Sequence, residues 1–121
     1  MAGAVLLRCG SVNIRQQTGL KVPKQKQIED FILRNRLDIC SFQEIDCNNE
    51  TFSNCKFISS SFNLLTNNSP SKYGTACLVK SDLNIENIHF DNAGRVIVFD
   101  VADITIASVY LPSGTGPEAH Q

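Results

Sequence analysis

Hydrophobic and polar positions along the first part of the chain switch between a strand pattern and a helix pattern. The run AVLLRCGSVNI (4–14) is apolar and rich in strand-forming residues. In the next segment Ile28, Phe31 and Ile32 follow the i, i+3, i+4 spacing of an amphipathic helix. Strand character returns over 38–43 (DICSFQ). This order predicts two parallel strands joined by a right-handed helical crossover.

The rest of the chain predicts short strands separated by turns. The strand-like runs are 56–66 (KFISSSFNLLT), 73–80 (YGTACLVK), 83–90 (LNIENIHF), 95–101 (RVIVFDV) and 104–111 (ITIASVYL). Turn residues at 81–82, 91–94 and 102–103 divide the last four runs. This spacing predicts antiparallel hairpins or a meander.

One stretch is more apolar than a half-exposed sheet requires. The segment RVIVFDVADITIASVYL (95–111) is apolar at most positions, and such strands need cover on both faces. One helix is too small to cover both faces of a sheet of six or seven strands. The pattern therefore predicts an α/β fold in which part of the sheet lacks its partner layer.

Composition limits the possible classes of protein but does not indicate a binding partner. The 121 residues suit one domain or part of one, and the formal net charge of −1 neither requires nor excludes nucleic acid. Five cysteines without C-x-x-C spacing and two separated histidines argue against a zinc site and for reduced thiols in an intracellular protein. The N-terminal apolar run is broken by Arg8, so we expect no signal peptide and no membrane span.

Polar residues at the ends of apolar strands are the candidates for chemistry. Asn13 follows the first strand, Glu44 ends the second, and Tyr110 lies in the last. Parallel strands would bring Asn13 and Glu44 to one carboxyl edge of the sheet, where α/β proteins build their sites. Their oxygen atoms suit a hard cation such as Mg²⁺. The alternative is structural: Glu44 caps a loop, Asn13 stabilises a turn, Tyr110 is part of the core, and Arg95 is an exposed residue at a strand start.

Four stretches resemble the N-terminal half of the endonuclease/exonuclease/phosphatase superfamily. They are SVNIR (11–15), DICSFQEI (38–45), YGTACLVKSDL (73–83) and GRVIVFDVADITIASVYLPSGT (94–115), in the family's order. The resemblance is strongest to the endonuclease domain of non-LTR (LINE-type) retrotransposons, which is similar to apurinic/apyrimidinic endonucleases. It implies part of a DNase I-like four-layer α/β/β/α sandwich, with a mixed sheet and one outer helix. It places this partial domain at 1–112 and a loop or disordered tail at 113–121.

The resemblance also implies roles for individual residues. Glu44 matches the glutamate that binds Mg²⁺, with Mn²⁺ as an alternative, and Asn13 matches the asparagine beside that metal. Tyr110 matches the tyrosine that hydrogen-bonds the scissile phosphate. The implied activity is nicking of one strand of duplex DNA, in the nucleus for a retrotransposon-type enzyme. No residue is assigned to DNA binding and none to an organic cofactor.

The chain also departs from the family. Neither the Asp-x-Asn motif nor the Ser-Asp-His motif follows Tyr110, and His120 matches no family position. We therefore expect no turnover from these 121 residues alone. A non-catalytic remnant of a transposable element, and a phosphatase or RNA exonuclease of the same superfamily, stay open. The resemblance further implies that the chain supplies much of one sheet and its outer helix. The uncovered inner face would then need the missing C-terminal half or self-association.

Overall fold

The computed structural model describes residues 6–14, 22–46, 56–68 and 73–111. The elements are β1 (Cys9–Asn13), α1 (Val22–Asn35), β2 (Ile39–Ile45), α3 (Lys56–Ser61), β3 (Phe62–Asn67), β4 (Gly74–Lys80), β5 (Ile85–Phe90), β6 (Val96–Val101) and β7 (Ile104–Val109). The predicted tail at 113–121, with His120, lies outside the described residues. Within the described part, neither helix is long and apolar enough to cross a bilayer.

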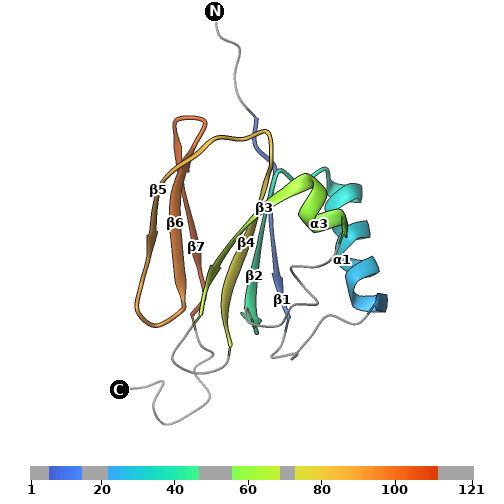
Figure 1. Cartoon of the computed structure of the whole chain (residues 1–121), viewed down its shortest axis with the longest axis horizontal. Coiled ribbons are helices and arrows are strands. Elements are labelled where there is room, and N and C mark those ends of the chain that lie inside the picture. The colour runs from blue at the N-terminus through green and yellow to red at the C-terminus, as the bar shows by residue number, and fades with distance from the viewer. Residues whose placement is uncertain (1–5, 15–21, 47–55, 69–72, 112–121) are drawn as a thin grey trace, which may run out of the picture.

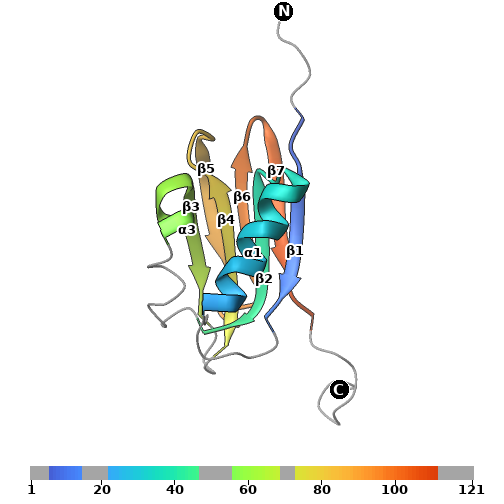
Figure 2. The ribbon, with the colours of Figure 1, turned by 90° about the vertical axis from the view of Figure 1, so that its right-hand side faces the viewer.

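Two sheets pack face to face, and the helices lie on the outer side of the larger one (Figure 1). The first sheet has the strand order β1-β2-β4-β3, and the second has the order β5-β6-β7. Strands β1 and β2 are parallel, as predicted, whereas all other pairs are antiparallel. Figure 2 shows α1 crossing the first sheet as the link between β1 and β2. The described layers are therefore helix, sheet and sheet.

Helix α1 is fixed to the first sheet by its apolar stripe and by its C-terminal cap. Ile28 and Ile32 are buried in one cluster with Phe42 of β2. At the helix end, the N–H of Leu37 donates to the carbonyl of Ile32 at 3.0 Å, and the N–H of Arg36 donates to the carbonyl of Leu33 at 3.2 Å. These two bonds, with Arg36 in the left-handed conformation (φ 52°), form a Schellman cap. The cap turns the chain directly into β2.

A second apolar cluster joins the two sheets. The inner face of the first sheet contributes Ile39, Cys77 and Val79. Strand β6 of the second sheet contributes Ile97, Phe99 and Val101, each at most 2% exposed. Strands β5–β7, which follow β4 along the chain, fold back over this inner face as a second sheet. Strands β5–β7 therefore cover the inner face over β2 and β4, and the expectation that this chain supplies only one sheet was wrong. Along β1 the same face stays open, where Cys9 and Ser11 are exposed and line a hollow of about 390 Å³ that β7 borders.

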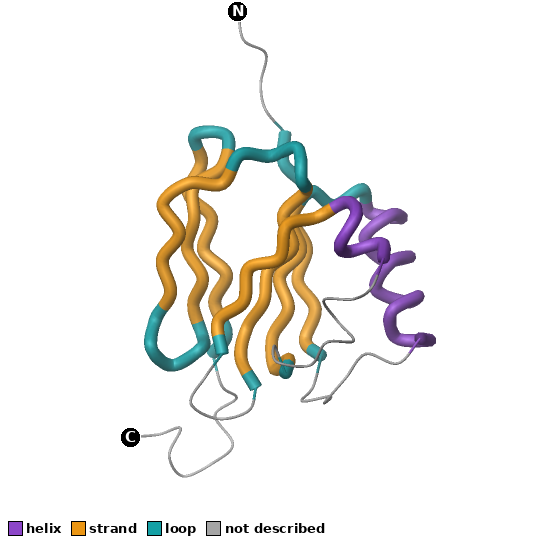
Figure 3. Tube along the Cα trace, in the orientation of Figure 1, coloured by secondary structure: helices purple, strands orange, loops and turns teal. Residues whose placement is uncertain are grey.

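A larger uncovered surface is the outer face of the second sheet. The ladder places Val96 and Val98 of β6 opposite Val109 and Ala107 of β7 on this face. Val109 is 49% exposed. Both helices lie on the far side of the molecule, so no described element covers these residues (Figures 1 and 3). The predicted need for cover on both faces of 95–111 is thus met on the inner face but not on the outer one.

Other differences from the predicted elements are local. The run 56–66 was expected to be one strand, but its first half is the short helix α3 and only its second half enters the sheet as β3. The carbonyl of Ser61 at the end of α3 accepts a hydrogen bond from the N–H of Ser81 at 3.0 Å. This contact with the turn after β4 is tertiary, so the local pattern could not reveal it. A single outer helix was therefore an underestimate.

Candidate functional site

Glu44 is placed by an irregularity at the end of β2. The register with β4 shifts between Gln43 and Ile45, so Glu44 is the extra residue of a β-bulge. Its φ of 56° lies in the left-handed region, which is unfavourable for a residue with a Cβ. In a regular strand Glu44 would share the buried helix-side face of Phe42, and the bulge re-aims it. Strain of this kind is tolerated where the surrounding structure fixes it, often at a functional site.

Tyr110 meets Glu44 across the gap between the two sheets. The Tyr110 hydroxyl donates a hydrogen bond to Oε1 of Glu44 at 2.6 Å, although 66 positions separate the two residues. Tyr110 follows the end of β7, and its N–H donates to the carbonyl of Arg95 at 2.8 Å. The ends of β2 and β7 are therefore held together at one end of the sandwich. The contact favours a shared site over the alternative in which Tyr110 is only a core residue.

The hydrogen bond to Glu44 raises the pKa of Tyr110 above its ordinary value. Partial burial and the negative charge of the Glu44 carboxylate act in the same direction, whereas the nearby Arg95 guanidinium opposes them. Ionisation of the phenol would place a second negative charge beside the carboxylate. Tyr110 is therefore held as a neutral hydrogen-bond donor at physiological pH.

Asn13 lies at the same edge of the first sheet. In the parallel ladder Asn13 pairs with Gln43, the residue before Glu44. The next residue, Ile14, is buried, and its N–H donates to the carbonyl of Gln43 at 2.9 Å. The structure thus places all three predicted site residues at neighbouring strand ends, and it joins Glu44 and Tyr110 directly. Asn13 comes from β1, so its proximity depends on the predicted parallel pairing.

Two features of this region were not identified from the sequence as part of a site. Arg95 is exposed, as its pattern predicted, but the β6–β7 ladder puts it opposite Tyr110. Beneath the site, Gln43 is joined by hydrogen bonds to serines of two strands. The hairpin spacing around 102–103 could have located Arg95 beside Tyr110. Nothing in the local sequence pairs Gln43 with the serines.

The donor set suits one hard divalent cation. Mg²⁺ is commonly bound through one or two protein carboxylates, and water and substrate phosphate fill its other positions. Glu44 offers a carboxylate and Asn13 a carboxamide at the same edge. Among the described residues, no group of three His, Cys, Asp or Glu side chains is arranged to hold a metal. The residues present therefore fit a sparse oxygen-ligand site, not a cage of protein ligands.

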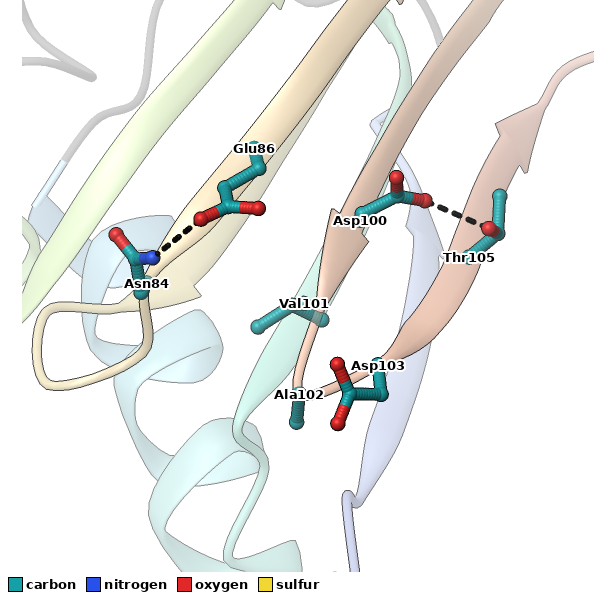
Figure 4. Close-up of a pocket in the computed structure, with 7 residues that line it drawn as sticks. All are labelled: Asn84, Glu86, Asp100, Val101, Ala102, Asp103 and Thr105. Carbon is teal, nitrogen blue, oxygen red and sulfur yellow. Dashed lines mark hydrogen bonds between the residues drawn. The ribbon is translucent and has the colours of Figure 1, made fainter.

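A separate hollow lies at the opposite end of the second sheet, around the β6–β7 turn (Figure 4). Its volume is about 410 Å³, and its lining includes Glu86, Asp100 and Asp103. Oδ1 of Asp100 accepts a hydrogen bond from the Thr105 hydroxyl at 2.6 Å. Oε1 of Glu86 accepts one from the Asn84 amide at 3.0 Å. Each of these bonds joins residues close in sequence, so we assign no chemistry to this hollow.

Known structures share this fold. An AP endonuclease from Archaeoglobus fulgidus superposes with a TM-score of 0.66 and 17% sequence identity, over 93% of this chain and 44% of that chain. TDP2 from Caenorhabditis elegans superposes with a TM-score of 0.51 and 20% identity, over 80% of this chain and 32% of that chain. No family model matches the sequence, and no curated protein sequence matches it either.

The chain therefore has the DNase I-like α/β fold. This confirms the predicted fold class and the likeness to apurinic/apyrimidinic endonucleases at the level of the fold. The chain spans less than half the length of either of these structures. At such low identities the superposition shows the fold alone. The function has to be argued from the site.

Proposed function

We propose that this chain carries the N-terminal part of a phosphodiester-cleaving site that acts on duplex DNA. The observation that carries the proposal is the hydrogen bond between Tyr110 and Glu44, at the edge where Asn13 also ends its strand. It joins two of the three residues that family resemblance selected, on a fold shared with an AP endonuclease, and the third, Asn13, ends its strand at the same edge. The site gathers a carboxylate, a carboxamide and a phenol donor, which are suited to binding a phosphate and a cation.

Glu44 and Asn13 would hold a divalent cation, with Mg²⁺ as the candidate that their oxygen atoms favour. When bound there, the cation would supply Lewis-acid polarisation of the scissile phosphate. The chain's own residues then have separate tasks. Glu44 keeps the Tyr110 hydroxyl oriented before substrate arrives. The Tyr110 hydroxyl can rotate to donate its hydrogen bond to a phosphate oxygen. Negative charge that develops on this oxygen strengthens the bond.

Arg95 adds positive charge beside this donor. Its guanidinium lies close enough to lower the pKa of Tyr110, against the larger effect of Glu44. The side chain is exposed, so a phosphodiester backbone can reach it. An arginine beside a phosphate-binding site can form charge-assisted hydrogen bonds to phosphate oxygens. We assign Arg95 to substrate binding.

The retrotransposon-type assignment rests on sequence stretches. YGTACLVKSDL (73–83) and VYLPSGT (109–115) carry the resemblance to LINE-type endonucleases. The corresponding reaction nicks one strand and leaves a 3′-hydroxyl, and its cellular location would be the nucleus. Completion of the site would require the groups of the missing motifs. These would come from a further C-terminal portion of the domain, and self-association is the alternative way to cover exposed sheet surface.

The test is whether Glu44 governs cation binding. We expect Mn²⁺, followed by electron paramagnetic resonance, to bind the chain and to lose most of its affinity in Glu44→Gln. Glu86→Gln is the matched control, because Glu86 is an exposed carboxylate at the other end of the molecule. Equal affinity in both variants would overturn the proposed site.

The substrate class is tested on the Mn²⁺-loaded chain by competition among duplex DNA, single-stranded RNA and an inositol phosphate. Preference for duplex DNA that is reduced by Arg95→Gln supports the proposal. Preference for RNA or for the inositol phosphate favours the other activities of the superfamily. Nicking of supercoiled plasmid by the chain, lost in Glu44→Gln, would contradict the expectation that these residues alone lack turnover.

A further inference from the structure

The layer between the two sheets changes character along its length. Around Phe99 it is apolar and fully buried. Toward the end that carries Glu44 and Tyr110, polar side chains replace the apolar ones. The Ser41 hydroxyl of β2 contacts the Ser108 hydroxyl of β7, and the Gln43 amide donates to Ser41 Oγ at 2.9 Å. The same amide donates to Ser11 Oγ of β1, also at 2.9 Å.

These four residues form one connected network, which we call the Gln43–serine network (Ser11, Ser41, Gln43 and Ser108). Gln43 and Ser108 are buried, at 8% and 5% exposed, whereas Ser41 is partly buried and Ser11 is exposed. A buried carboxamide is costly unless its hydrogen bonds are made, and here both amide hydrogens of Gln43 have acceptors. The network links strands β1 and β2 of the first sheet to β7 of the second. Apolar side chains could also have filled the space between these strands.

The network lies directly beside the two residues of the site, which suggests its role. Gln43 directly precedes Glu44, and Ser108 is two residues before Tyr110. In an extended strand, residues i and i+2 share a face, so the placement of Ser108 sets the placement of Tyr110. The Ser41–Ser108 contact is thus a direct bridge between the two strands whose ends must meet.

We propose that Gln43, Ser41 and Ser108 are positioning residues, which fix the spacing of β2 and β7 so that the Tyr110 hydroxyl reaches Glu44. This inference rests on the proposed function, because it assigns the network to that site. Apolar side chains pack without directional preference and allow two sheets to slide. Hydrogen bonds between hydroxyl and amide groups specify one arrangement. The network therefore defines geometry where the site needs it, while the Phe99 layer supplies the apolar packing.

Tyrosine emission reports this geometry without any need for activity. The sequence contains no tryptophan and two tyrosines, so Tyr73→Phe leaves Tyr110 as the single tyrosine. A phenol that is hydrogen-bonded to a carboxylate loses emission, because the carboxylate can accept its proton in the excited state. We expect low emission from Tyr110 in metal-free buffer and a rise in Glu44→Gln.

Ser108→Ala in this background should recover at least half of the rise that Glu44→Gln produces. Ser108→Thr keeps the hydroxyl and should keep the low emission. Ser81→Ala, at an exposed serine in the turn after β4, is the matched control and should leave emission unchanged. Circular dichroism establishes that each variant is folded. Should Ser108→Ala fail to fold, Ser11→Ala takes its place, since it removes one Gln43 acceptor at an exposed position.

The outcomes separate this inference from the proposed function. If the folded network variants keep the low emission while Glu44→Gln raises it, the network does not position Tyr110 and the inference is overturned. If the network variants raise emission but Glu44→Gln leaves Mn²⁺ affinity unchanged, the positioning role stands and the metal site is overturned. Unchanged emission in Glu44→Gln would mean that the Tyr110–Glu44 bond does not form in solution, which overturns both.

Discussion

Glu44 combines an unfavourable backbone conformation with a directed side-chain bond. Its positive φ places it at a bulge, and its carboxylate accepts the Tyr110 hydroxyl. A glycine would adopt this conformation at lower cost, but it could provide no carboxylate. The conformation therefore costs local stability at a position whose carboxylate bonds Tyr110. We expect the pKa of the Tyr110 phenol to report most directly on this arrangement.

The pKa of Tyr110 should lie above the ordinary tyrosine value of about 10 in metal-free buffer. Because the pKa is raised on folding, the hydrogen bond contributes stability below about pH 10, and this contribution is lost as the pH rises through the raised pKa. Glu44→Gln removes the carboxylate and should lower the Tyr110 pKa. Absorbance titration at the tyrosinate band in the Tyr73→Phe background measures it. A Tyr110 pKa that is the same in the Glu44→Gln variant as in the parent chain would contradict this interpretation.

At the scale of elements, the two sheets are held together chiefly through β6. Ile97, Phe99 and Val101 face the first sheet, and Phe99 is fully buried. A second link joins β3 to the β5–β6 hairpin at the hairpin's turn. The Asn67 amide donates to the Asp91 carboxylate at 2.8 Å and to the carbonyl of Val96 at 2.9 Å. The hydrogen bonds orient the hairpin, and the apolar layer supplies most of the free energy.

Phe99→Ala should therefore lower the free energy of unfolding by about 3–5 kcal/mol, since it removes a buried aromatic side chain and leaves a cavity. Leu33→Ala is the control: Leu33 is 57% exposed on α1, and its loss should change stability by about 0.5 kcal/mol or less. Urea unfolding followed by circular dichroism measures both. If the Phe99→Ala protein is unfolded at the start, Phe99→Leu should show a smaller loss. Equal effects of Phe99→Ala and Leu33→Ala would exclude a packed layer between the sheets.

At the scale of the whole molecule, one sheet face exposes apolar side chains that a further layer of structure would normally cover. The outer face of the second sheet exposes valine and alanine side chains on β6 and β7, and no described element covers them. Strand β7 is an edge strand without a charged residue. Exposed apolar faces and uncharged edges favour association with another chain. The need for self-association or for a further part of the domain, which the sequence placed on the inner sheet face, stays a prediction, and we expect this outer face to show it as well.

Val109→Lys should reduce concentration-dependent association, because it places a charge on this face at the edge strand. The change should have little effect on stability, since Val109 is 49% exposed. Light scattering over a concentration series measures association. Asn63→Lys adds the same charge at an exposed position on β3, so it should leave association as in the parent chain. The expectation fails if both variants associate alike.

The pattern of apolar positions was sufficient for the local elements around the site. The strand–helix–strand order predicted the parallel pairing of β1 and β2, and this pairing brings Asn13 to the edge where Glu44 lies. The strands after residue 73 and their turns were also predicted close to their observed bounds. These features follow from the period of side-chain burial, which is a property of each segment by itself.

Tertiary structure decided how those elements were distributed and which side chains meet. A period of two shows that a strand buries one face, but not which sheet the strand joins. It was therefore not foreseen that this chain supplies strands of both sheets of the sandwich. The bulge at Glu44 and the short helix α3 arise from contacts with distant strands. The Tyr110–Glu44 bond and the Gln43–serine network connect residues up to 67 positions apart. The sequence by itself determined the segments and the candidate residues, and only long-range packing could determine the site, because its geometry lies between the sheets.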